Sequence, residues 1–177
     1  MAGGKVPSRF SPSLEATSYT GSNGSPFASG TNVAEVEVDI LTGNVKLIKY
    51  SVAHDCGVMI NPKIVEGQII GGVVHGIGNA LFERMIYSDT GQPLTNTYAD
   101  YLLPLATEMP NVEIVHEESP SPLNTLGVKG AGEGGTIPAT AAVVAAIENA
   151  LKQFDVEIDY YPVNPQHLTE LIDRSVP

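Results

Sequence analysis

The feature that most constrains this chain is a glycine-rich stretch that runs from Leu126 to Pro138. It contains five glycines and a single carboxylate, Glu133. Glycine lets the backbone take positive φ angles and lets another molecule approach closely. Thr136 suits the N-cap of a following helix and Pro138 its first turn. Because N–H groups at the start of a helix favour anions, the stretch predicts a loop that holds Glu133 beside an anion-favouring helix terminus.

Two interpretations of Glu133 follow from these residues. The first is a solvated glutamate in a mobile surface loop, which is the more frequent situation for a residue of this kind. The second is a catalytic base presented on a shaped backbone, which needs access to the proton that it removes and a pKa near the working pH. Sequence supplies neither quantity, so both interpretations stay open at this point.

The glycine-rich stretch also fits the dinucleotide-binding pattern, as Gly130-x-Gly132-x-x-Gly135. That pattern requires a hydrophobic strand immediately before the first glycine. Residues 119–125 are instead rich in serine and proline, which is typical of turns. The chain after the stretch is too short for a complete mononucleotide-binding half, and no Gly-Lys-Ser/Thr sequence closes a P-loop. We therefore reject both phosphate-binding motifs.

Length and charge narrow the class of protein. The 177 residues correspond to one domain, or to one lobe of a larger assembly. Nine basic and twenty acidic side chains give a net charge of −11, which argues against a nucleic-acid partner. No apolar run is long enough to span a membrane, and no signal-peptide core follows the first residues. Cys56 is the only cysteine, which favours a reducing, cytoplasmic compartment and a buried, unreactive thiol. The four histidines lack metal-ligand spacing, so no metal site built by this chain is expected.

The distribution of apolar residues predicts one folded region preceded by an irregular segment. Residues 1–31 are rich in Ser, Gly, Pro and Thr and are expected to be extended or draped over a partner, whereas residues 32–177 are expected to fold. Alternation at 33–40 and 45–52 predicts a β-hairpin. Further strands are predicted at 82–87 with a partner after 93, at 112–117 and at 156–161, and helices at 63–82, 138–154 and 165–172. This irregular order predicts an α+β fold of two layers, a mixed sheet with packed helices.

The predicted helix at 63–82 is unusual because it contains five glycines. Each costs about 1 kcal/mol relative to alanine, so the helix requires stabilising tertiary contacts and is expected to be buried. The pairs Gly67/Gly71 and Gly72/Gly76 would form smooth faces for a neighbouring backbone. Gln68 would then be a buried amide that needs hydrogen-bond partners, and a structural role is the simpler interpretation of it.

Three blocks of sequence together resemble a known family. They are His54-Asp55-Cys56-Gly57-Val58-Met59-Ile60-Asn61-Pro62, the glycine-rich helix over residues 65–78, and Gly127-Val128-Lys129-Gly130-Ala131-Gly132-Glu133. In this order and spacing they resemble the C-terminal part of the molybdenum-binding subunit of molybdenum hydroxylases, the xanthine dehydrogenase, aldehyde oxidase and aerobic carbon monoxide dehydrogenase family. The resemblance runs from about Leu14 to the C-terminus, with details closer to the bacterial carbon monoxide dehydrogenase-like branch. With this resemblance, the catalytic base becomes the preferred interpretation of Glu133, in place of the solvated glutamate.

The resemblance implies a molybdenum cofactor-binding domain and a set of site residues. Glu133 is then the catalytic base, and Gln68 lies at the pterin cofactor. Lys129, Gly130, Ala131, Gly132 and Gly134 are the expected contributors to the lining of the same cavity. The implied cofactor is molybdopterin with molybdenum, in the cytosine dinucleotide form, with no metal ligand from this chain. The implied reaction inserts an oxygen derived from water into a substrate carbon, and electrons leave through Fe–S clusters to FAD on partner chains.

The chain departs from that family in length, because the family's molybdenum subunit is several times longer. We therefore expect either a separately encoded piece of a split subunit or a fragment, inactive when isolated. Activity would require the missing N-terminal molybdopterin-binding portion, an Fe–S subunit, an FAD subunit and a small-molecule substrate. The alternative is a non-catalytic structural or assembly module, or an inactive fragment, that keeps this fold.

Overall fold

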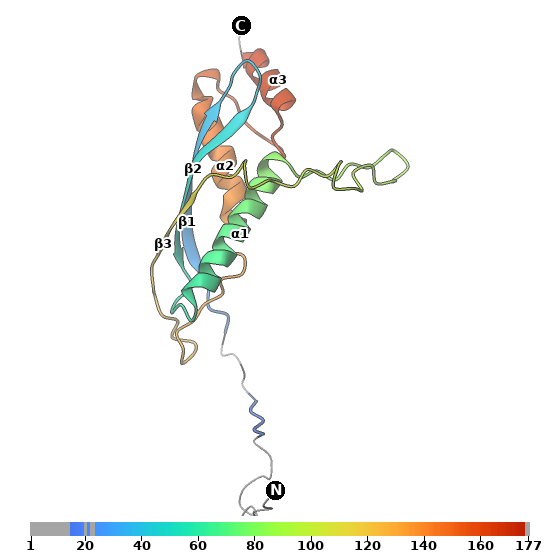
Figure 1. Cartoon of the computed structure of the whole chain (residues 1–177). Coiled ribbons are helices and arrows are strands. Elements are labelled where there is room, and N and C mark those ends of the chain that lie inside the picture. Colours follow the sequence, from blue (N-terminus) through green and yellow to red (C-terminus); the bar gives the residue numbers. More distant parts are fainter. Residues whose placement is uncertain (1–14, 20, 22–23, 176–177) are drawn as a thin grey trace, which may run out of the picture.

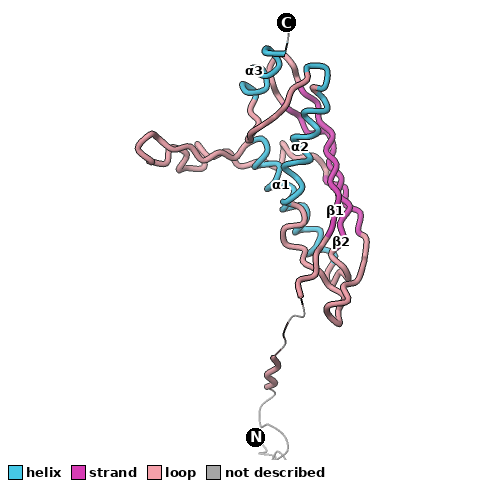
Figure 2. Tube along the Cα trace, turned by 180° about the vertical axis from the view of Figure 1, so that it is seen from behind, coloured by secondary structure: helices cyan, strands magenta, loops and turns pink. Residues whose placement is uncertain are grey.

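The structure, a computed structural model, describes residues 15–19, 21 and 24–175. They form an α+β fold with a three-stranded sheet in one layer and helices against one side of it (Figure 1; from behind in Figure 2), as the sequence predicts. Most of the N-terminal segment expected to be extended, residues 1–14, 20 and 22–23, lies outside the described residues. In chain order the elements are β1 (Ser29–Val38), β2 (Val45–Asp55), α1 (Pro62–Leu81), β3 (Val112–His116), α2 (Thr136–Ala150), the 3₁₀ helix η1 (Lys152–Phe154) and α3 (Pro165–Ser175).

The sheet is mixed, because β1 and β2 form the predicted antiparallel hairpin and β3 runs parallel to β2. A bulge between Glu35 and Val36 leaves Ile48 without a partner in β1. This extra residue interrupts the alternation of buried and exposed side chains along β2, so that Leu47 and Tyr50 are both buried while Ile48 is exposed. Beyond the bulge, alternate residues of β2 face the helices, and this alternation continues to the end of the strand.

The helix layer depends on the close approach of α1 and α2. A side chain at Gly72 would come within 2.8 Å of the Thr136 nitrogen, and one at Gly76 would overlap Ala139. The Thr140 hydroxyl donates a hydrogen bond to the Gly76 carbonyl at 3.0 Å. The predicted glycine face at Gly72 and Gly76 is thus confirmed. The core beneath it combines both helices, β2 and α3, with fully buried side chains at Tyr50, Val52, Ile69, Val73, Ile77, Val143, Ile147, Leu151 and Leu168.

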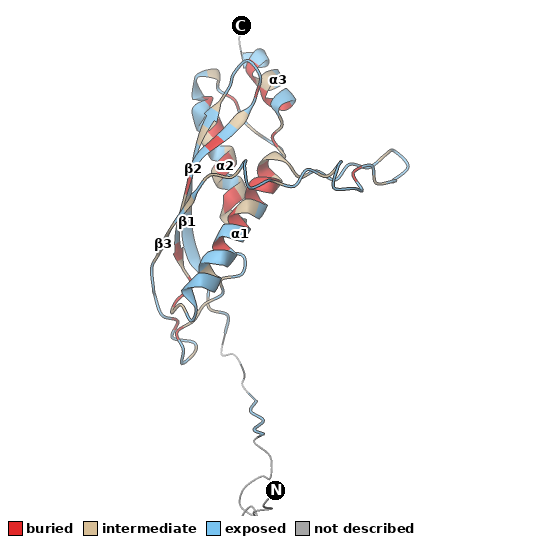
Figure 3. Ribbon diagram, in the orientation of Figure 1, coloured by how far each residue is buried: buried red, intermediate tan, exposed pale blue. Residues whose placement is uncertain are grey.

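The prediction that α1 is buried is wrong for its first half. Ile64 is 64% exposed and Gln68 is also exposed, and a side chain at Gly67 or Gly71 would meet nothing within 4 Å. Figure 3 shows this half of α1 largely pale blue and the half nearer Leu81 largely red. Apolar and glycine residues occur on both sides of α1, and such a pattern does not indicate which side finds a partner within the chain.

Several predicted bounds also change. Residues 82–93 contain only an isolated bridge between Tyr87 and Pro93 instead of a pair of strands, and residues 156–161 form no strand. β1 begins at Ser29, before the predicted start, because residues 29–31 pair with an extension of β2 to Asp55. Thr136 is the first residue of α2, and Gly135 occupies the N-cap without a side-chain hydrogen bond. An alternating or turn-rich sequence does not by itself establish a strand, because a strand forms only where another segment pairs with its backbone.

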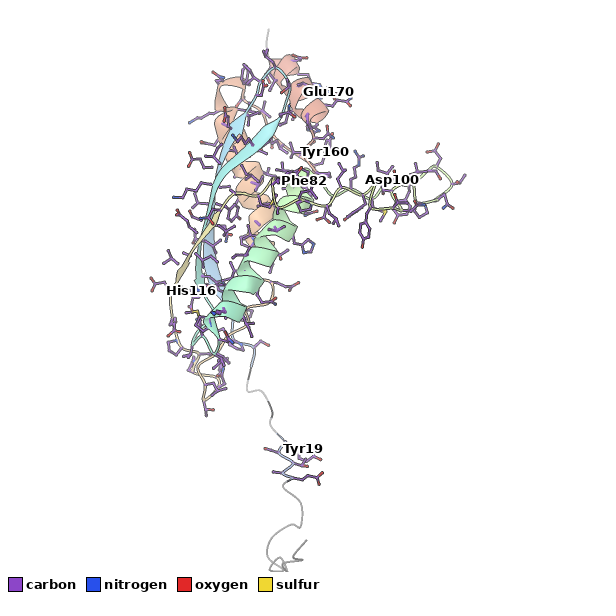
Figure 4. All side chains as sticks on the ribbon, in the orientation of Figure 1. Tyr19, Phe82, Asp100, His116, Tyr160 and Glu170 are labelled. Carbon is purple, nitrogen blue, oxygen red and sulfur yellow. The ribbon has the colours of Figure 1, made fainter. Side chains whose placement is uncertain are left out.

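Residues 83–108 form an arm that extends away from both layers (Figure 1). Figure 4 labels Phe82, where the arm leaves α1, and Asp100 in its outer part. Within the arm, the Tyr101 hydroxyl donates to Glu83 at 2.7 Å and the Ile86 N–H donates to the Thr95 hydroxyl at 2.9 Å. The hydrophobic core of the described residues contains no arm residue.

Candidate cofactor-binding site

A pocket of about 500 Å³ lies between the glycine-rich loop and residues 26–30, at the start of β1. This volume is in the range of small-molecule and cofactor sites. Besides Glu133, its lining consists of loop glycines, the start of α2, the approach to β1 and one histidine: Pro26, Phe27, Ala28, Ser29, Gly30, His54, Gly130, Gly132, Gly134, Ile137 and Pro138. The pocket therefore joins three segments that are far apart in the sequence.

An ion pair attaches the loop to the sheet. Lys129 Nζ lies 2.7 Å from Asp55 Oδ2, and the two side chains are 12% and 13% exposed. Asp55 Oδ1 also accepts hydrogen bonds from the N–H groups of Gly57 at 2.8 Å and Ser119 at 3.1 Å. The hydrogen bond from Lys129, followed by that from Gly57, lowers the pKa of Asp55 to about 2. Asp55 is consequently an anion at neutral pH that fixes Lys129 below the loop.

Backbone contacts reinforce this attachment. The Lys129 N–H donates to the Cys56 carbonyl at 2.7 Å, and the Val58 N–H donates to the Gly127 carbonyl at 3.1 Å. Gly57 has a φ of +68°, and a side chain there would overlap the Gly127 carbonyl oxygen. Only glycine therefore allows the segments around Gly57 and Gly127 to approach this closely. Cys56 is buried, as predicted, and burial raises the pKa of its thiol.

His54 forms the floor of the pocket. Its side chain is 2% exposed, and a Cβ atom at Gly134 would overlap its imidazole ring. Burial lowers its pKa, the neighbouring His116 lowers it further, and Asp55 opposes the change. The Nε2 atom is buried and has no hydrogen-bond partner among the described residues. The ring is therefore a neutral, buried group with an unused polar atom directly beneath the loop.

His116, labelled in Figure 4, extends this arrangement to β3. It pairs in register with His54, and both of its ring nitrogens are buried without hydrogen bonds among the described residues. Its Nε2 atom lies 3.9 Å from Glu66 Oε1, which is an ion-pair contact only when the ring is protonated. Two adjacent histidines thus close the lower end of the sheet.

Glu133 combines an exposed side chain with a fixed backbone. Its carbonyl accepts hydrogen bonds from the N–H groups of Thr136 at 3.1 Å and Ile137 at 3.2 Å, which ties it to the first turn of α2. Its carboxylate has no hydrogen bond or ion pair with another described residue. The carboxylate is therefore available to a molecule in the pocket.

The loop also offers unpaired backbone donors. Among the described residues, no N–H group from Gly130 to Gly134 donates a hydrogen bond. A side chain at Gly130 or Gly132 would meet nothing within 4 Å, so the space beside these backbones is open. Together with the N-terminus of α2, such donors suit an anionic group.

The structure brings together four of the predicted site residues, because Gly130, Gly132, Glu133 and Gly134 all line the pocket. Ala131 lies between them in the loop but does not contribute to the lining, and Lys129 directs its side chain to Asp55. Gln68 lies on the exposed half of α1 and is not part of this pocket.

The sequence interpretation missed His54 and residues 26–30, which lie just before β1 and at its first two positions. Tyr50, Val52 and His54 occupy alternate positions in β2 and are all buried, so extension of the predicted strand by three residues would have placed His54 on the inner face. No comparable pattern in residues 26–30 indicates that they line the pocket.

Within the part of the chain that the structure describes, no three or more His, Cys, Asp and Glu side chains are grouped so that they could hold a metal ion. No described helix has the length and apolar character required to cross a membrane.

Comparison with known proteins supplies an independent identification. Residues 5–110 match the molybdopterin cofactor-binding domain family. The nicotine 6-hydroxylase large subunit of Paenarthrobacter nicotinovorans is 44% identical over 162 residues, which are 92% of this chain and 20% of that protein. The carbon monoxide dehydrogenase large chain of Hydrogenophaga pseudoflava is 40% identical over 79% of this chain and 18% of its own length. An alignment of 162 residues in a chain of 177 necessarily includes the glycine-rich loop.

Solved structures agree with this assignment. Quinoline 2-oxidoreductase from Pseudomonas putida 86 superposes with a TM-score of 0.80 at 44% identity, over 82% of this chain and 19% of that one. The Cu,Mo-CO dehydrogenase gives a TM-score of 0.88 at 27% identity, over 96% of this chain and 21% of that one. The chain spans about one-fifth of the length of the relatives that it matches. It belongs to the molybdenum hydroxylase family, in which it corresponds to part of a molybdopterin-binding large subunit.

Proposed function

We propose that this chain supplies the catalytic glutamate, Glu133, and part of the cofactor-lining wall of a molybdenum hydroxylase. The observation that carries the proposal is the position of Glu133, whose unpaired carboxylate lines a pocket built from the glycine-rich loop, in a chain of this family. In this role the carboxylate accepts the proton that is released as a water-derived oxygen is inserted into a substrate carbon.

The pocket residues fit an anionic cofactor. The open space at Gly130 and Gly132 and the unpaired N–H groups of the loop would let a phosphate or pterin group contact the backbone. The buried, unpartnered Nε2 of His54 is a further polar atom below the same wall. When bound, the molybdenum cofactor supplies the two-electron redox centre of the reaction.

In this proposal, different residues of the chain have different roles at the site. Asp55 and Lys129 hold the loop in place, so that the position of Glu133 is set before a substrate arrives. The N–H groups of residues 130–134 bind and orient the anionic group. Gln68 lies outside the pocket, and we propose that it reaches the cofactor from the exposed half of α1 once the remainder of the subunit is in place.

The rest of the assembly is proposed from the family. It consists of the missing molybdopterin-binding portion, an Fe–S subunit and an FAD subunit, with molybdopterin in the cytosine dinucleotide form. Because the chain spans one-fifth of its relatives, we expect no turnover from it in isolation. The single free thiol, Cys56, supports a reducing cytoplasm as the compartment.

The decisive experiment compares Glu133→Gln with Glu37→Gln in the complete enzyme. Glu37 is also exposed but lies on β1, away from the pocket. Loss of a general base should lower kcat by about 10²- to 10⁴-fold for Glu133→Gln, with unchanged molybdenum content, whereas Glu37→Gln should retain normal values of both. Turnover of Glu133→Gln within a few-fold of the parent would refute the catalytic role and favour a structural or assembly module.

A further inference from the structure

The arm over residues 83–108 exposes an unusual amount of apolar surface. Six large apolar side chains are each at least half exposed along it: Met85, Tyr87, Leu94, Tyr98, Leu102 and Leu105. Tyr98 alone is 87% exposed. Scattered exposed apolar residues are ordinary, but a concentration of them in one segment marks a surface that is covered by another molecule.

Polar contacts hold the arm in shape without covering these side chains. Leu94 N–H donates to the Ile86 carbonyl at 2.8 Å, and the Tyr101 hydroxyl bonds to Glu83 at the base of the arm. Beside these contacts, a hollow of about 400 Å³ is lined by Met85, Tyr98, Tyr101 and residues 95–97. The arm is therefore preformed, with a recess large enough for an apolar side chain of a partner.

We infer that the arm is the docking surface for the remainder of the large subunit, namely the part outside these 177 residues. The chain spans one-fifth of its relatives' length, so about four-fifths of such a subunit is available to cover the arm. A second copy of this chain fits less well, because each copy carries a net charge of −11 and two copies would repel each other. The apolar character of the six side chains requires an apolar protein surface as the complement.

This inference depends on membership of the family and deepens the proposed assembly, but it does not depend on the role of Glu133. Glu133→Gln should leave docking of the arm unchanged, since Glu133 lies in the pocket at the start of α2 and not on the arm. An active Glu133→Gln enzyme with a docked arm would refute the catalytic proposal and leave the present one intact.

Photo-crosslinking in the assembled protein provides the test. A photoactivatable aromatic amino acid replaces Tyr98 or, as a control, Leu41, which is 86% exposed in the turn between β1 and β2. The Tyr98 position should yield crosslinked peptides from the large subunit outside residues 1–177, at least tenfold more abundantly than the Leu41 position. Equal yields at both positions, or crosslinks from Tyr98 mainly to another copy of this chain, to the Fe–S subunit or to the FAD subunit, would overturn the inference.

Hydrogen exchange gives a second readout. In the assembled protein, the double substitution Tyr98→Asp/Leu102→Asp should detach the arm and increase amide exchange over residues 94–105 at least tenfold. Both side chains lie outside the core, so exchange in α1 and α2 should stay unchanged. Leu41→Asp should change neither region. Unaltered exchange of the arm in the double variant would contradict docking through these side chains.

Discussion

Asp55→Asn should detach the glycine-rich loop from the sheet, and the expected loss of stability follows from the structure. The pKa of Asp55 falls from its ordinary value of 3.8 to about 2. Each pKa unit of difference corresponds to about 1.4 kcal/mol, so the ionised carboxylate stabilises the folded state by about 2 to 3 kcal/mol at neutral pH. The substitution also leaves the Lys129 ammonium, which is 12% exposed, without its partner. We therefore expect a total loss of about 2 to 4 kcal/mol.

The dependence on pH has a defined sign. Because the folded pKa is lowered, the stabilisation by Asp55 is complete above the unfolded pKa near 4 and disappears as the pH falls towards 2. The parent protein should lose this increment between pH 4 and pH 2, and Asp55→Asn should not. The two proteins should consequently differ least in stability at the lowest pH.

Urea unfolding followed by circular dichroism measures these differences, since the chain has no tryptophan. A double-mutant cycle with Lys129→Met isolates the ion pair, and the two substitutions should show a coupling of about 1 kcal/mol or more. Additive effects of Asp55→Asn and Lys129→Met, or a loss below about 0.5 kcal/mol for Asp55→Asn, would refute the claim that this pair anchors the loop.

The two remaining predictions concern the helices and the buried histidines. Gly76→Ala should destabilise the fold by about 1 to 3 kcal/mol because its Cβ would overlap Ala139, whereas Gly71→Ala should stabilise it by up to about 1 kcal/mol because the added methyl meets nothing within 4 Å and favours the helix. Equal shifts in the melting temperatures of the two variants would contradict this packing. Stability should also fall as the pH drops below about 6.5, since an unfolded His54 binds a proton that burial and the neighbouring His116 disfavour in the folded state. His54→Gln should flatten this dependence in urea titrations between pH 7.5 and 5.5, and an unchanged slope would exclude His54 as its source.

The local patterns of the sequence were sufficient to predict several elements. The alternation around residues 33–52 predicts the hairpin because one face of a strand pair is buried and the other is solvated. The glycines at 72 and 76 predict a close helix contact because only a residue without a side chain permits one. The glycines around Glu133 likewise indicate an open backbone wall, and the resemblance to molybdenum hydroxylases gave this glutamate its proposed role.

Other features depend on contacts between distant segments. The ion pair between Asp55 and Lys129 joins residues that are 74 positions apart, and neither residue type indicates its partner. His54 becomes a pocket residue only because the parallel strand β3 and the loop at Gly134 close around it. The unpaired half of α1 and the arm cannot be recognised from composition, since apolar residues look the same whether a partner is within the chain or outside it. Local sequence determines which conformations are favourable for each segment, whereas tertiary packing decides which surfaces are buried, because burial depends on neighbours that the local sequence does not specify.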